Sequence, residues 1–117
     1  MKREINILPA DTFVVVNRTI LNESDRKIIS MLYQPIIGCI ATDLYYTLWT
    51  DLDKTELLSG EYTHHHLMTS LRVKMDSIVT ARKKLEGVGL LKTFVKKGDV
   101  NTVSYTHLRA HETSAHL

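Results

Sequence analysis

Apolar residues near the start of the chain form one short block and then recur at helical spacing. Residues 12–17 hold four consecutive apolar side chains, three of them β-branched, and predict a strand. Such an unbroken apolar run is typical of a strand that is covered on both faces or paired with another chain. Asn22 or Ser24 then offers the cap of a helix. The buried stripe of that helix is expected at Ile28, Ile29, Leu32 and Tyr33.

Proline and the next apolar stripe divide this region into two helices. The first helix is expected to end near Gln34 and Pro35, because the residue before a proline is pushed out of the helical region. A second helix is expected to begin between residues 37 and 39 and to run to about residue 52. Its apolar face is the most regular in the sequence and comprises Ile40, Leu44, Tyr45, Leu48 and Trp49.

The second half of the chain predicts a short helix, a basic helix and a hairpin. Thr63 could cap a helix over residues 64–71, and a break at residues 72–75 separates it from a helix over residues 76–86. A strand over residues 90–97, a turn at Gly98 and a return strand over residues 100–103 follow. This order of elements is that of a winged helix-turn-helix. We therefore predict an α+β fold, a winged helix-turn-helix with an extra N-terminal strand and a C-terminal wing hairpin.

Composition places the chain among ordinary globular domains. Its 117 residues suffice for a single domain, and 24% are charged while 44% are apolar. The single cysteine, Cys39, cannot form an internal disulfide, so a cytoplasmic location is expected. No signal peptide is expected, nor a transmembrane helix, because no run approaches about 18 uninterrupted apolar residues.

Charge is segregated along the chain. The formal net charge is +2, but residues 72–97 contain eight Lys or Arg against Asp76 and Glu86. A basic block of this kind can attract phosphates, and it can equally be a solvated helix face followed by a charged hairpin.

A nucleic-acid interface is one hypothesis for this block. Ser77, Thr80 and Lys84 would reach base edges from the basic helix. The candidates for backbone or phosphate contact are Lys83, Lys92, Lys96 and Lys97. Arg82 is the only arginine of that helix and lies beside its apolar stripe, so sequence-specific recognition is weakly supported.

Neither metal binding nor catalysis is expected. Three adjacent histidines, residues 64–66, point about 100° apart on a helix and suit a solvated cap better than a metal ion. His111 and Glu112 begin a zinc-protease motif, but the second histidine, His116, lies at the wrong spacing. No nucleophile set, phosphate loop or nucleotide motif is present, so the sequence predicts no enzyme, no metal and no cofactor.

Residues 103–113 resemble a peptide produced when sequencing-adaptor DNA is translated, and half of the six histidines fall in the last 11 residues. We therefore predict a domain over residues 1–103 and a non-native tail over residues 104–117.

Residues 1–103 resemble the N-terminal domain of the DnaB replication-initiation and membrane-attachment proteins of Gram-positive bacteria, in the DnaD/DnaB helicase-loader family. The segment from Leu32 to Gly38 (LYQPIIG) is the most specific, supported by residues 8–11 (LPAD) and by the basic helix running into Gly89, Leu90 and Leu91. The resemblance implies a primosomal module that acts with DnaD-type and initiator proteins, the helicase and its loader. It also implies an oligomerisation scaffold with weak, nonspecific DNA contact, and membrane association only through the full-length protein.

The apolar N-terminal strand bears on the scaffold hypothesis. A minimal winged helix offers this strand no obvious partner, so a second protomer would cover its edge. The alternative is that it joins the chain's own wing. The self-association candidates are Phe13, Val14, Val15 and Val16. The rival functional class is a sequence-specific winged-helix transcription regulator.

Overall fold

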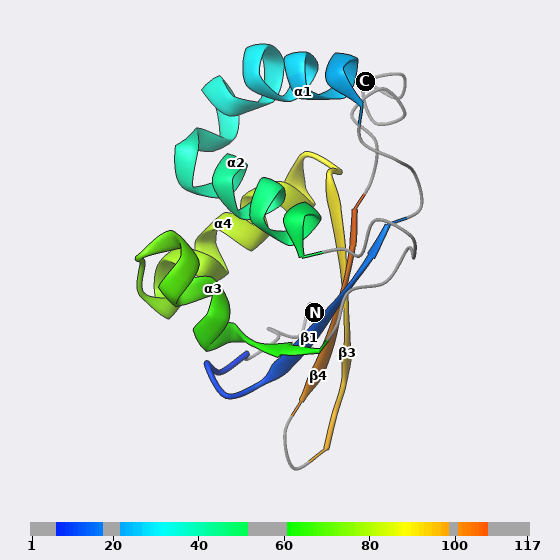
Figure 1. Cartoon of the computed structure of the whole chain (residues 1–117). Helices are drawn as coiled ribbons and strands as arrows, with labels where there is room; N and C mark the ends of the chain where they lie inside the picture. Colours follow the sequence, from blue (N-terminus) through cyan, green and yellow to red (C-terminus); the bar gives the residue numbers. More distant parts are fainter. Residues whose placement is uncertain (1–6, 18–21, 52–60, 99–100, 108–117) are drawn as a thin grey trace.

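The structure is a computed structural model, and it describes residues 7–17, 22–51, 61–98 and 101–107. Four strands form one mixed sheet in the order β2-β1-β4-β3. Their bounds are Thr12–Asn17 (β1), Tyr62–Thr63 (β2), Leu91–Lys96 (β3) and Thr102–His107 (β4). The helical segments are Glu23–Ile28 (α1), Ile29–Tyr33 (the π-helix η1), Gln34–Thr50 (α2), His64–Leu71 (α3) and Met75–Gly87 (α4). The helices lie on one side of the sheet (Figure 1).

This architecture confirms the predicted winged helix-turn-helix, including the extra N-terminal strand and the wing. Strands β3 and β4 form the antiparallel wing hairpin. Strand β1 lies parallel to β4 along its whole length, from Thr12 opposite Thr102 to Asn17 opposite His107. Its other side pairs antiparallel with β2 through Thr12 and Phe13. The apolar strand is thus inserted between two strands of its own chain.

The first break in the helical region is not at Pro35. The chain passes from α1 through the π-helix into α2 without leaving the right-handed helical region. Pro35, which has no N–H, follows a turn in which the Gln34 N–H already bonds five residues back, to the backbone oxygen of Ile29. The break comes at Gly38, whose φ of 84° and ψ of 169° are not helical. Glycine adopts this φ without the clash that a Cβ would cause, so the sequence places the kink three residues after the proline.

The core lies between the helices and the inner face of the sheet. It includes Leu44, Leu48, Leu67, Ile78 and Leu85 from the helices, and Phe13, Val15, Val103 and Tyr105 from the strands. The apolar residues of α3 and α4, spaced at intervals of three and four, therefore face inward. Two residues of the earlier predicted stripes do not, because Leu32 and Ile40 are 58% and 42% exposed. The π-turn shifts the helix face that follows it, which a regular 3.6-residue period does not anticipate.

The second wing strand is longer than predicted. It begins at Thr102 and continues to His107, so the expected boundary after residue 103 falls inside β4. Tyr105 is buried in the core, and Thr106 is also buried. Residues 104–107 thus complete the sheet in this structure, whereas the histidines at 111 and 116 lie outside the described residues. The non-native origin of residues 104–117 stays a prediction.

One helical stretch, Glu23–Thr50, is long and apolar enough to cross a membrane by length and composition, with a mean hydropathy of 1.3. Polar residues interrupt this stretch, so the absence of a long unbroken apolar run did not predict it. The stretch is kinked at Gly38, and Ile37, Leu44 and Leu48 on its inner side belong to the core. A core helix passes the same test of length and composition.

Candidate functional site

The predicted recognition residues on α4 border a groove beside α2. Ser77, Thr80 and Lys84 lie along one flank of α4, because their spacing of three and four residues returns to the same side of a helix. They line a groove of about 390 Å³ whose opposite wall is the kinked start of α2, including Ile37 and Ile40. Thr80 and Lys84 are exposed and Ser77 is half-buried. The structure brings these three together, but it places them against a neighbouring helix rather than on a freely projecting one.

Lys83 is exposed on α4 but stands about 100° around the helix from Lys84. Lys92 and Lys96 are exposed on β3 and project from the face of the sheet opposite to the helices, while Lys97 follows the end of that strand. The predicted candidates therefore fall on two surfaces, the α4 groove and the outer face of the sheet.

Arg82 does not belong to either surface. Its side chain is 4% exposed, and its Nε lies 3.8 Å from a carboxylate oxygen of Glu86. Burial of this long donor leaves α4 with Asp76, Thr80, Lys83 and Lys84 as its exposed polar residues, beside the half-buried Ser77 and Glu86. Specific recognition of guanine by a bidentate arginine is therefore unavailable to this helix.

The four apolar residues of β1 divide between the two faces of the sheet. Phe13 and Val15 are fully buried on the inner face, and Val14 and Val16 are half-buried on the outer one. The Phe13 ring packs among aromatic side chains, with centroid distances of 5.2 Å to His64 and 5.8 Å to Tyr105. The position of β1 matches the alternative in which the strand joins its own sheet. A role of residues 13–16 in self-association stays a prediction.

A candidate surface that the sequence analysis missed runs along η1 and the start of α2. We call it the η1–α2 ridge, and it consists of Met31, Leu32, Ile36 and Ile40. Met31 and Ile36 are each 72% exposed, which is unusual for large apolar side chains close together on one helical segment. This surface was not predicted because Leu32 and Ile40 were placed in buried stripes, without the π-turn and the break at Gly38 that lie between regular helical turns here.

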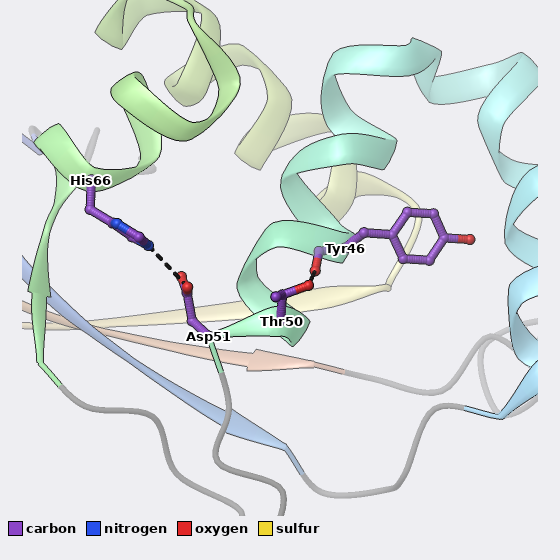
Figure 2. Close-up of polar contacts among 4 residues, drawn as sticks. All are labelled: Tyr46, Thr50, Asp51 and His66. Carbon is purple, nitrogen blue, oxygen red and sulfur yellow. Dashed lines mark hydrogen bonds and ion pairs between the residues drawn. The ribbon is translucent and has the colours of Figure 1, made fainter.

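The histidines of α3 have separate structural roles. His64 is fully buried, so the expectation of a solvated cap is wrong for this residue. Burial lowers the pKa of His64, since the charged form loses its hydration. His65 is exposed, and His66 points to the end of α2, where its Nε2 lies 2.9 Å from an Asp51 carboxylate oxygen (Figure 2).

The contact between His66 and Asp51 ties α3 to the end of α2, and among the described residues it is not part of a metal centre. In the last turn of α2, the Thr50 hydroxyl donates to the backbone oxygen of Tyr46 at 2.8 Å (Figure 2). Over the described ranges, no three His, Cys, Asp or Glu side chains are grouped so that they could hold a metal ion.

Comparison with known proteins places this fold in a family. Residues 7–115 match the family model of the DnaB N-terminal winged helix domain. The chain is 28% identical over 114 residues to the replicative helicase loading/DNA remodeling protein DnaB of Staphylococcus aureus (strain NCTC 8325 / PS 47), covering 97% of this chain and 24% of that protein. The chain thus spans about a quarter of that relative's length.

A solved structure shows the same fold. The crystal structure of primosome protein DnaB (residues 1–300) from Geobacillus stearothermophilus superimposes with a TM-score of 0.81 at 37% identity, over 89% of this chain and 40% of that one. Sequence motif, topology and family model agree, and the chain belongs to the DnaB N-terminal winged helix domain family.

Proposed function

We propose that this domain is a non-enzymatic protein-interaction module of a replication-initiation protein, acting in helicase loading in the cytoplasm. The η1–α2 ridge is the observation that carries the proposal. Four large apolar side chains stay exposed there, although 18 apolar residues of the described part of the chain are buried in the core. Exposed apolar clusters of this kind mark contact surfaces.

The ridge suits self-association. A contact between two copies related by a two-fold axis buries the same side chains on both copies. The ridge of one copy can therefore cover the ridge of the other. Strand β1 is less suited to this role, because one side pairs with β4 along its whole length and the other pairs with β2 through Thr12 and Phe13. Assembly with other replication proteins would use the same apolar surface or the α4 groove beside it.

Sedimentation of the 117-residue chain over a range of micromolar concentrations tests this proposal. Wild type should form a dimer or a larger assembly, and Ile36→Asp should weaken it at least about tenfold, since central apolar residues dominate interfaces. Ile36 is 72% exposed, so an aspartate at this site stays in solvent and the fold should persist. The matched control is Phe94→Thr, which removes another exposed apolar side chain from a different surface. A wild-type monomer at all concentrations would refute the proposal.

Nonspecific DNA contact is a second role, favoured by the exposed lysines of α4 and β3. The rival, a sequence-specific transcription regulator, needs α4 to enter the major groove. The position of Ser77, Thr80 and Lys84 along the α2 groove and the burial of Arg82 argue against it. If the chain bound some duplex sequences much more tightly than others, the result would support the transcription-regulator hypothesis.

A further inference from the structure

The outer face of the sheet carries an exposed aromatic ring between two lysines. Phe94 is 60% exposed, which is unusual for a phenylalanine. Side chains alternate along a strand, so Lys92 and Lys96 project from the same face as Phe94. The burial pattern of β3 shows this alternation, with Leu91 buried and these three residues exposed.

The neighbouring strands continue this face with small uncharged side chains. Ser104 of β4 lies beside Phe94, and Val14 of β1 lies beyond Ser104. Thr102 lies beside Lys96 in the same way. No acidic side chain projects outward from the described residues of β1, β3 and β4, and the acid Glu61 precedes β2 at the opposite edge of the sheet. The electrostatic potential around the Phe94 ring is therefore positive.

We propose that this face binds single-stranded DNA, with a base stacked on the Phe94 ring and phosphates held by Lys92, Lys96 and Lys97. An exposed flat ring offers an unpaired base a stacking surface, whereas the bases of a duplex are already stacked inside it. The flanking lysines supply the charge complementary to the phosphates. Protein interfaces, by contrast, are depleted in lysine at their centre.

The dimensions of the face fit a short strand. Lys92 and Lys96 are four residues apart on β3, a span of about 13 Å. Phosphates of a stacked strand recur about every 3.4 Å, so the two lysines bracket about four nucleotides. The surface is separate from the η1–α2 ridge, so the inference does not rest on self-association; it rests on the proposed nonspecific DNA contact, which it assigns to this face.

Binding of the 117-residue chain to a fluorescein-labelled dT15 oligonucleotide at low salt, measured by anisotropy, tests the site. Wild type should bind dT15 more tightly than a 15-base-pair duplex, with a log–log salt slope of about −2 for three phosphate contacts. Phe94→Thr keeps a residue favoured in strands and should weaken dT15 binding about 5-fold to 150-fold. Phe94→Trp should retain binding, and its added fluorescence should be quenched by dT15. Ile36→Asp should leave dT15 binding unchanged.

The opposing outcomes are distinct. Absence of dT15 binding at low salt, or wild-type affinity in folded Phe94→Thr, would overturn the proposal. Preferential duplex binding that is lost in Lys83→Glu/Lys84→Glu but kept in Phe94→Thr would assign DNA contact to α4 instead. A change of oligomeric state in Phe94→Thr, without loss of dT15 binding, would make this face a contact between copies. Circular dichroism establishes that each variant is folded.

Discussion

His64 Nε2 lies 2.7 Å from the hydroxyl oxygen of Tyr105, a contact that joins α3 to β4 across 41 residues of sequence. The other ring nitrogen, Nδ1, donates to the backbone oxygen of Asp11 at 2.6 Å, just before β1 begins. A neutral imidazole with its proton on Nδ1 satisfies both contacts, because Nε2 then accepts from the Tyr105 hydroxyl. Burial raises the pKa of Tyr105, so this hydroxyl remains a donor.

Tyr105→Phe removes the donor and leaves His64 Nε2 buried without a partner. The free energy of unfolding should fall by about 1–3 kcal/mol, measured by urea denaturation. Tyr46→Phe is the matched control, because its hydroxyl makes an exposed contact of 3.3 Å with the backbone oxygen of Arg26, and it should change stability by no more than about 0.5 kcal/mol. Equal effects of the two changes would contradict this account of the buried contact.

The lowered pKa of His64 predicts a pH dependence of stability. Burial is the main cause and the Arg82 charge adds to it, while the Asp11 backbone contact and carboxylate oppose it. The unfolded chain binds the proton more readily than the folded one, so stability is highest above the unfolded pKa of about 6.5 and falls as the pH decreases. The slope due to this residue is at most about 1.4 kcal/mol per pH unit. Urea titrations between pH 7 and pH 5 should show a shallower slope in His64→Gln than in wild type.

The sequence predicted the class of fold and most elements because the apolar spacing of α3 and α4, and the β-branched block of β1, are local signals. It did not predict where β1 lies in the sheet, because strand order depends on contacts between distant residues. The exposure of Leu32 was also not predictable from local spacing. Its spacing fits a buried stripe, but the π-turn rotates it outward.

Truncation tests the contribution of residues 104–107. A chain that ends after residue 103 loses most of β4, and with it the pairing partners of β1 from Val14 to Asn17 and of β3 from Leu91 to Phe94. It should be far less stable in thermal denaturation than a chain that ends after residue 107. Equal melting temperatures of the two truncated chains would show that this part of β4 adds nothing to the domain.

Val15→Asp places a carboxylate in the core, because Val15 is fully buried on the inner face. Burial of an unpaired charge is among the costliest single changes, and the variant should lose more than about 3 kcal/mol or fail to fold. Val14→Thr, on the half-buried outer face of the same strand, should stay folded with a much smaller loss. A folded, stable Val15→Asp monomer would instead support a contact between protomers through β1.

The candidate sites were predicted less well than the fold. The lysines of α4 and β3 are exposed as expected, but the sheet separates them into two surfaces. Phe94 was predicted to lie in a strand, but the face of the sheet on which it lies was not predicted. Alternation of side chains alone does not show which face of the wing the helices cover. The η1–α2 ridge was not predicted, because apolar residues at helical spacing usually lie in the core.

A spin label on Cys39 tests the central proposal most directly. This cysteine is exposed and lies between Ile36 and Ile40 in the chain, and the sequence holds no other. Association through the η1–α2 ridge brings two labels together, so electron–electron dipolar spectroscopy at high micromolar concentration should give a defined distance. That signal should vanish in Ile36→Asp and persist in Phe94→Thr. A wild-type chain that associates without any dipolar signal, or with one that Ile36→Asp leaves intact, would contradict the proposal.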